Sequence, residues 1–215
     1  MNVLIAGASG FLGSYLTKSF VDEGHNVFVL IKKDSNKYRL KGYLEKCTFC
    51  YNKEEDFDSI FEDNNIDLVI NTVVNYGRKS LELNPIIRAN LTFGLLLLES
   101  SIKFKVKAFI NSDTMLEREL DSYSLSKAQF LDWMKFLPNQ FTKTINIKIE
   151  HIFGVMDDDS KFVYWLIDKL KANVKEIDLT AGVQKRDFIY IDDVINAYII
   201  IAKNIEHFSQ FEEFE

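Results

Sequence analysis

The sequence predicts an α/β domain with a doubly wound parallel sheet, and three observations indicate this class. Short apolar runs typical of buried strands alternate with helical stretches along most of the chain. A glycine-containing turn at residues 7–13 directly follows the first apolar run. The 215 residues, 47% of them hydrophobic, are enough to bury one sizeable core. We therefore expect a single sheet with helices on both faces.

The elements follow one another in a regular alternation. The first strand is expected at residues 2–6 and the next helix at 11–23, where apolar residues recur at helical spacing. A long helix is expected at residues 80–101, with Pro85 near its start, where proline is tolerated. The other strands are expected at 26–31, 47–51, 67–74, 106–111 and 144–150, and the other helices at 54–63 and 122–136.

The turn at residues 7–13 has the spacing of a binding site for the pyrophosphate of a dinucleotide. Gly7 can take a tight turn, Gly10 lets the backbone approach a phosphate, and Gly13 lets the helix lie close to the strand. The start of the helix adds N–H groups and the positive end of its dipole. The alternative is a β–α turn without a ligand. We expect the cofactor to contact the three glycines together with Ser9, Phe11 and Leu12.

Composition and charge exclude several classes of partner. The net charge of −6 and the pI near 5.2 argue against nucleic acid or an anionic membrane as partner. No apolar stretch is long enough to span a bilayer, and the sequence begins with a strand rather than a leader, so we expect a soluble cytoplasmic protein. Cys47 and Cys50 are interpreted as two ordinary thiols, and no metal site is expected.

A tyrosine and a lysine occupy one face of the helix at 122–136. Tyr123 and Lys127 are four residues apart, which places them on neighbouring turns. A free phenol has a pKa of about 10, and a nearby ammonium group favours phenolate. We therefore expect Lys127 to lower the pKa of Tyr123 for acid–base catalysis at a carbonyl or an alcohol. A hydroxyl on the preceding strand would bind the substrate oxygen, and Ser112 and Thr114 are both candidates.

Together with the segment at 186–194, these motifs resemble the extended short-chain dehydrogenase/reductase family of nucleotide-sugar epimerases, dehydratases and reductases. The resemblance covers essentially the whole chain. It implies a Rossmann-fold NAD(P)-binding domain at 1–155 and, at 156–215, a partial substrate-binding lobe with a returning strand and helix. Family members usually continue further, so we expect a truncated small lobe that ends in a cut strand.

Within this family, the segments at 75–78, 111–114 and 179–188 are most similar to CDP-abequose and CDP-paratose synthases. This resemblance implies NADPH-dependent reduction of the C4 ketone of a CDP-linked 4-keto-3,6-dideoxyhexose, in the biosynthesis of surface polysaccharide such as lipopolysaccharide O-antigen. It also implies Thr114 as the catalytic hydroxyl, Tyr123 as the proton donor and Lys127 as its electrostatic partner.

Two local features refine the reaction. NAD-preferring relatives carry an acidic residue after the second strand, whereas this chain has Lys32 and Lys33, which suit a 2′-phosphate. We therefore expect NADP(H), with NAD(H) as the alternative. Dehydratases carry an Asp-Glu pair after the catalytic hydroxyl, but Met115 and Leu116 stand here and cannot serve as acid and base. A sugar-nucleotide 4-epimerase and a non-catalytic NADP(H) sensor or scaffold remain as alternative functions.

The resemblance also assigns further contacts. We expect a homodimer formed through the helix after the fourth strand and the helix that carries Tyr123. The substrate, a CDP-sugar or another nucleotide-sugar, is expected to contact Asn75, Tyr76, Arg78, His151 and Arg186. The cofactor is expected to contact Asn71, Val73, Asn90, Ser112, His151 and Ile152, as well as Tyr123 and Lys127.

Overall fold

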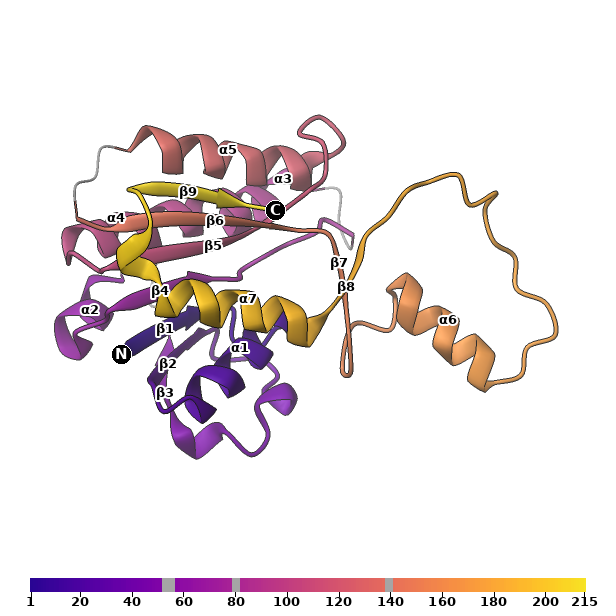
Figure 1. Ribbon diagram of the computed structural model, residues 1–215, viewed down its shortest axis with the longest axis horizontal. Coiled ribbons are helices and arrows are strands. Elements are labelled where there is room, and N and C mark those ends of the chain that lie inside the picture. The colour runs from indigo at the N-terminus through magenta and orange to yellow at the C-terminus, as the bar shows by residue number, and fades with distance from the viewer. Residues whose placement is uncertain (52–56, 79–81, 138–140) are drawn as a thin grey trace.

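A seven-stranded parallel sheet forms the centre of the molecule, with the strand order β3-β2-β1-β4-β5-β6-β9 (Figure 1). The computed structural model describes residues 1–51, 57–78, 82–137 and 141–215. This topology confirms the predicted doubly wound α/β class. The strands are β1 (Asn2–Ala6), β2 (Asn26–Ile31), β3 (Cys47–Tyr51), β4 (Leu68–Asn71), β5 (Ala108–Thr114), β6 (Lys143–Ile149) and β9 (Phe211–Phe214).

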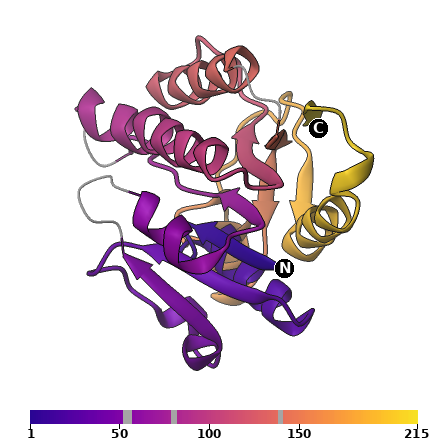
Figure 2. The ribbon, with the colours of Figure 1, turned by 90° about the vertical axis from the view of Figure 1, so that its left-hand side faces the viewer.

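Helices cover both faces of this sheet (Figure 2). On one face α1 (Phe11–Asp22) and α7 (Ile191–Lys203) pack against the strands. On the other face lie α2 (Asp58–Asn64), α4 (Phe93–Lys103) and α5 (Ser122–Phe136). The two apolar layers account for the continuous buried runs of the central strands, because a parallel sheet covered on both faces has no polar side.

The strand order reverses at β1, which pairs with β2 on one side and with β4 on the other. Ala6, the last residue of β1, is in register with Leu30 and Asn71. The glycine turn therefore begins at the topological switch point, where ligands of such sheets bind.

The long helix is divided into three parts, α3 (Leu83–Ile87), a π-helical turn (Arg88–Thr92) and α4. The prediction placed a single helix at 80–101, and its first two residues lie outside the described part of the chain. The first residues of the helix predicted at 54–63 also lie outside it. Short 3-10 turns occur at Tyr38–Leu40, Leu44–Lys46 and Ile205–His207.

Two strand predictions need correction. β4 ends at Asn71 rather than at residue 74, and β5 continues to Thr114 rather than ending at 111, so both candidate hydroxyls lie within a strand. The sheet has seven strands instead of six, because β9 pairs in parallel with β6 along its whole length.

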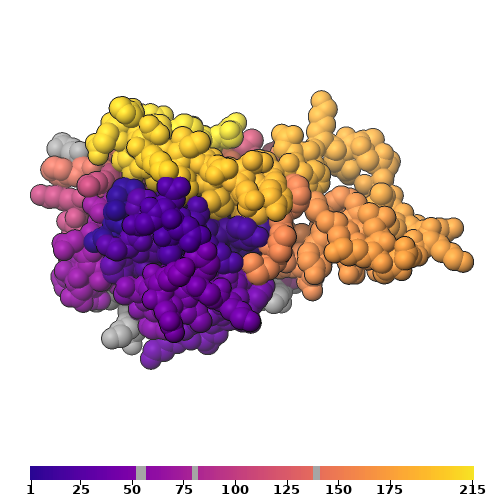
Figure 3. Space-filling view, turned by 60° about the horizontal axis from the view of Figure 1, so that its bottom comes forward, coloured from indigo at the N-terminus to yellow at the C-terminus, as the bar shows by residue number. Residues whose placement is uncertain are grey.

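A smaller unit lies beside the main sheet. β7 (His151–Phe153) and β8 (Phe188–Tyr190) form a two-stranded parallel sheet. Between them, α6 (Phe162–Lys171) and the segment after it project from the body (Figures 1 and 3). None of the residues described in α6 is buried, whereas α7 and β9 belong to the main body. Across the described ranges, no helix is long and apolar enough to cross a membrane.

Candidate active site

The glycine turn brings β1, the loop after β4 and the start of α1 into close contact. Gly7 has a φ of +80°, a backbone conformation that residues with a side chain rarely adopt. A Cβ on Gly13 would lie 2.3 Å from the carbonyl oxygen of Gly7 and 2.8 Å from Thr72 Oγ1. A Cβ on Gly10 would lie 3.2 Å from the same carbonyl. The backbone of this turn therefore leaves no room for a side chain at Gly7 or Gly13, and little room for one at Gly10.

The start of α1 is suited to bind an anion. Gly10 is its N-cap, and no side chain in the described ranges caps it. The first backbone N–H groups of a helix lack partners within the helix, so those of Phe11, Leu12 and Gly13 can face a phosphate. Ser9 is half-buried beside them. Lys32 and Lys33 are exposed just after β2, and Leu30 of that strand accepts the N–H of Gly7 at 3.1 Å. These features fit a dinucleotide pyrophosphate.

Tyr123 is held in the first turn of α5 by a capping box. Asp121 accepts the N–H of Ser124 at 2.7 Å, and Ser124 Oγ accepts the N–H of Asp121 at 3.0 Å. This fixed start directs Tyr123 toward the carboxyl end of β5, where Thr114 influences the pKa of the phenol. Tyr123 is 9% exposed. The phenol is therefore sheltered from solvent.

The environment raises the pKa of Tyr123 rather than lowering it. Burial is the largest cause, and the nearby Tyr76 adds to it, whereas Thr114 acts in the opposite direction. The expectation that Lys127 lowers this pKa is therefore wrong in this structure. At neutral pH the phenol keeps its proton, which is the form that a proton donor needs.

Lys127 lies one helical turn after Tyr123 and is almost completely buried. Its Nζ donates to the backbone carbonyl of Ser112 at 2.6 Å. Burial lowers the pKa of Lys127, and the carboxylate of Asp113 opposes that effect. Ser112 therefore contributes its carbonyl to the site.

The side chain of Ser112 lies near another helix. Its hydroxyl accepts a hydrogen bond from the hydroxyl of Tyr198, on α7, at 2.7 Å. Of the two candidate hydroxyls, Thr114 is the one that influences the pKa of Tyr123.

Tyr76 and Arg78 lie next to Tyr123. The rings of Tyr76 and Tyr123 are 5.0 Å apart, and the Arg78 guanidinium lies 4.9 Å from the centre of the Tyr76 ring. Arg78 also donates to Ser160 Oγ at 3.4 Å, which links the loop after β4 to the start of the projecting segment. The structure thus brings these two residues to the predicted site.

Asn90 fixes the loop that carries Tyr76. Its Oδ1 accepts the N–H of Asn75 at 2.8 Å, and its Nδ2 donates to the carbonyl of Asn75 at 2.9 Å and to Ser126 Oγ at 3.0 Å. Asn90 lies in the π-helical turn and is buried. The Oδ1 of Asn75 accepts the N–H of Gly77 at 2.9 Å. Asn75 and Asn90 therefore shape the loop from within.

The remaining predicted residues lie at varying distances from this centre. Asn71 ends β4 and accepts the N–H of Val73 at 3.2 Å. His151 is half-buried on β7 with its ring 5.5 Å from Phe188, and Ile152 packs against the apolar layer of α1 and α7. Arg186 is exposed and donates to the carbonyl of Lys185 at 3.3 Å. No contact between described residues joins Arg186 to Tyr123.

A cavity of about 740 Å³ opens beside α6. Its lining includes Tyr38, Arg39, Phe153, Tyr164 and Tyr190. Among the described residues, Tyr123, Lys127 and Thr114 do not line it. The chemistry of the site therefore belongs to the end of β5 rather than to this cavity.

Sequence analysis missed several polar side chains under the site. Asn111, Asp113 and Asn146 are buried within β5 and β6, and Tyr198 is fully buried on α7. The sequence could have indicated them, because polar residues within otherwise apolar strands need hydrogen-bond partners in the interior.

Comparison with known proteins places these features in context. The sequence pattern of the NAD dependent epimerase/dehydratase family matches residues 3–215. CDP-abequose synthase of Salmonella typhimurium is 28% identical, over 99% of this chain and 74% of its own length. CDP-abequose synthase of Salmonella muenchen is 30% identical, over 94% and 70%.

The fold also matches that of solved structures. A UDP-glucose 4-epimerase of Thermotoga maritima with UDP-glucose superposes with a TM-score of 0.80 at 22% identity, over 93% of this chain and 72% of that one. This likeness concerns the fold alone.

Proposed function

The chain belongs to the NAD dependent epimerase/dehydratase family, and from this premise we propose that it reduces the C4 ketone of a CDP-linked 4-keto-3,6-dideoxyhexose with NADPH. The family and the relatives make it an enzyme that acts on nucleotide-sugars. The CDP-abequose synthases among its relatives support the choice of substrate. In this role the enzyme would serve surface polysaccharide synthesis in the cytoplasm.

One observation carries the proposed chemistry: the buried phenol of Tyr123 lies near Thr114 at the carboxyl end of β5, one helical turn before the buried Lys127. The switch point of the same sheet carries the glycine turn at residues 7–13. When bound, the nicotinamide supplies the hydride for C4. The residues of the chain bind and orient the ketone and provide the proton.

Each residue of the site has a distinct role in this proposal. Thr114 donates a hydrogen bond to the ketone oxygen and holds it beside Tyr123. Tyr123 transfers the phenolic proton to that oxygen as negative charge develops on it, which is typical of general acid catalysis. Lys127, whose Nζ is held by the carbonyl of Ser112, would bind the ribose of the nicotinamide through its ammonium group. Tyr76 covers one side of the phenol and excludes water from it.

Positive charge and aromatic surface would hold the two anionic ligands. The cofactor diphosphate would lie on the N–H groups at the start of α1, and Lys32 or Lys33 would bind a 2′-phosphate. Arg78, stacked on Tyr76, and Arg186 would engage the diphosphate of the sugar nucleotide. In that case the segment that carries Arg186 must move toward the site when substrate binds.

We further propose that the enzyme is a homodimer. Several large apolar side chains on α3 and α5 are exposed in the single chain. Exposed apolar patches of this kind often form contacts with another protein chain, which supports a dimer through these two helices. The exposed side chains are Leu83, Ile87, Leu125, Trp133 and Phe136.

The test combines the protein with NADPH and CDP-4-keto-3,6-dideoxyglucose and follows the absorbance of the reduced nicotinamide. The proposal predicts oxidation in a one-to-one ratio with the reduced sugar. An epimerase would retain its cofactor and show no net oxidation. A sensor or scaffold would bind NADPH without any turnover. Either of these results would reject the proposed reaction.

A further inference from the structure

Three buried asparagines and one aspartate form a continuous hydrogen-bonded row across the sheet. Asn71 Nδ2 donates to Asn111 Oδ1 at 3.2 Å, and Asn111 Nδ2 donates to Asn146 Oδ1 at 2.8 Å. Asn146 Nδ2 donates to Asp113 Oδ2 at 2.9 Å. We call these four residues the amide row. The row runs from β4 through β5 to β6 and returns to β5, where it ends at Asp113, directly before Thr114.

The carboxylate of Asp113 accepts both of the hydrogen bonds at this end of the amide row. Asp113 Oδ2 accepts from Asn146, and its Oδ1 accepts the backbone N–H of Thr114 at 2.8 Å. An ionised carboxylate has two acceptor oxygens, whereas an amide has one oxygen and one NH2 group. An asparagine at position 113 would therefore turn an NH2 group toward one of the two donors. The unmet hydrogen bond would lie in the interior, where such a group is costly.

Asp113 also supplies negative charge beside a buried lysine. Lys127 donates to the carbonyl of Ser112, the residue before Asp113. A buried ammonium group is unfavourable unless an opposite charge compensates it. The carboxylate of Asp113 raises the pKa of Lys127 against the larger effect of burial. Asp113 is therefore suited to keep Lys127 protonated.

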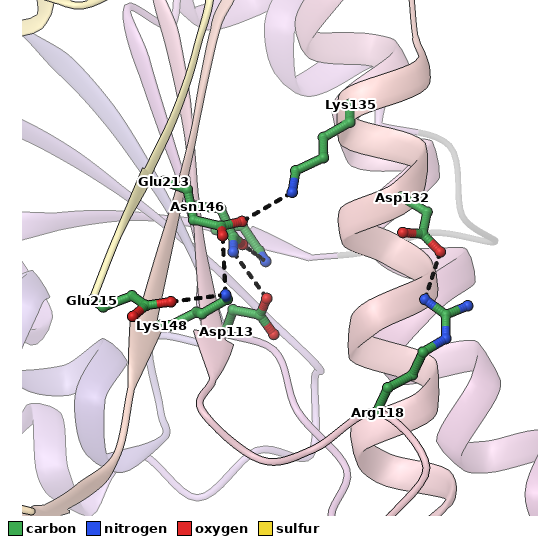
Figure 4. A network of polar contacts seen from close by, with 9 residues as sticks. Asp113, Arg118, Asp132, Lys135, Asn146, Lys148, Glu213 and Glu215 are labelled. Atoms are coloured by element: carbon green, nitrogen blue, oxygen red, sulfur yellow. Dashed lines mark hydrogen bonds and ion pairs between the residues drawn. The ribbon is translucent and has the colours of Figure 1, made fainter.

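The other titratable groups around Asp113 either pair with other residues or are phenols. Lys148, its register partner on β6, pairs with Glu213 at 2.9 Å and Glu215 at 3.0 Å (Figure 4). The negative charge of Asp113 also contributes to raising the pKa of Tyr123 on α5 and of Tyr198 on α7. Among these groups, Lys127 is the buried cation whose charged form Asp113 stabilises.

We propose that Asp113 is a positioning residue, whose carboxylate fixes the backbone of Thr114 and keeps Lys127 charged for the reaction. This inference depends on the proposed function for the roles of Thr114 and Lys127. It adds a residue that touches neither the sugar nor the nicotinamide. Its effect on the reaction passes entirely through its two neighbours.

The test compares Asp113→Asn with the double variant Asp113→Asn/Asn146→Asp. The single variant removes the negative charge of Asp113, and its new NH2 group faces one of the two donors, the N–H of Thr114 or the Nδ2 of Asn146. In the double variant the new amide at position 113 accepts from Thr114 and donates to the new carboxylate at position 146, which also accepts from Asn111. Every hydrogen bond of the amide row is thereby restored, while the negative charge moves from β5, whose Ser112 carbonyl binds Lys127, to the neighbouring β6.

Two measurements distinguish the loss of hydrogen bonds in the amide row from the loss of the negative charge near Lys127. Thermal unfolding reports the hydrogen bonds of the amide row. The alkaline midpoint of NADPH binding, followed by fluorescence across pH, reports the protonation of Lys127 and does not require turnover. If the wild type binds NADPH but does not reduce the sugar, the proposed function fails, and this titration still tests Asp113. Glu213→Gln is the control, because it removes a half-buried negative charge that pairs with Lys135 and Lys148.

Removing the anion makes the charged form of Lys127 less favourable, so its pKa falls. We expect Asp113→Asn to lower the alkaline midpoint by about one pH unit or more and to lower the melting temperature. The double variant should regain the melting temperature but only part of the midpoint, and Glu213→Gln should leave the midpoint unchanged. A folded Asp113→Asn with the wild-type midpoint would overturn the proposal. So would a double variant with the wild-type midpoint, even where the single variant does not fold.

Discussion

The rings of Tyr76 and Tyr123 lie 5.0 Å apart at an angle of 49°, and this contact shelters the phenol proposed to donate the proton. The guanidinium of Arg78 lies 4.9 Å from the centre of the Tyr76 ring. A cation beside an aromatic ring favours a stable stacked arrangement. The loop after β4 thus covers one side of the Tyr123 ring.

The first prediction concerns the proton donor itself. Tyr123→Phe removes the hydroxyl and keeps the ring, so the fold and cofactor binding should remain. We expect kcat to fall by about 10²- to 10⁴-fold, the usual contribution of a general acid. Steady-state kinetics measure this loss. Tyr43→Phe, which removes a surface phenol bonded to Asp22, should retain wild-type activity, and equal activity of Tyr123→Phe would refute the role.

A second prediction follows from the contact between the two rings. Tyr76→Ala opens the side of Tyr123 to water and removes a neighbour that raises its pKa. The pKa of Tyr123 should therefore fall toward its ordinary value, and the phenol should lose its proton at a lower pH. Ultraviolet titration of phenolate measures this, with Tyr76→Ala/Tyr123→Phe as the reference that isolates the signal of Tyr123. An unchanged titration of Tyr123 would mean that Tyr76 does not control its environment.

The third prediction compares two glycines of the turn. A Cβ at Gly13 would lie 2.3 Å from the carbonyl oxygen of Gly7, whereas one at Gly10 would lie 3.2 Å from it. We expect Gly13→Ala to lower the free energy of unfolding by roughly 1–3 kcal/mol, the usual cost of overpacking, and Gly10→Ala to lower it less. Denaturant unfolding measures both. Equal losses would contradict the close approach of helix and strand.

A fourth prediction tests the choice of cofactor. Lys32→Ala and Lys33→Ala remove positive charge just after β2, next to the turn. We expect the double variant to bind NADPH more weakly by tenfold or more, on the order of one lost charge-assisted contact, with NADH affinity little changed. Fluorescence titration with both cofactors checks it, and the exposed Lys41→Ala is the matched control. Tighter binding of NADH by the wild type would reject the preference for NADPH.

Local sequence patterns were enough to predict much of the fold. The glycine turn, the alternating elements and the Tyr123–Lys127 spacing each depend on a few neighbouring residues, so a short window of sequence carries the information. The parallel sheet follows from that alternation. The place of the last strand did not follow: a strand was expected at the end of the chain, but its pairing with β6 in the main sheet joins segments that are far apart in the sequence.

The electrostatics of the site could not be predicted in the same way. The pKa of Tyr123 depends on burial and on Tyr76, which comes from a loop far away in the sequence. The amide row joins residues from three strands, and its members are recognised as partners only once the strands are aligned. Helical spacing alone suggested that Lys127 acts on Tyr123, whereas the structure directs its Nζ to the carbonyl of Ser112.

The most direct test of the account is the transfer of deuterium from NADPH labelled at C4 of the nicotinamide to CDP-4-keto-3,6-dideoxyglucose. Both faces of the ring are tested with separately labelled cofactor, and the sugar product is analysed by mass spectrometry and NMR. The account predicts deuterium at C4 of the hexose from one of the two labels, with one NADPH oxidised per sugar reduced. A converted sugar without deuterium from either label, or NADPH that stays reduced, would contradict it.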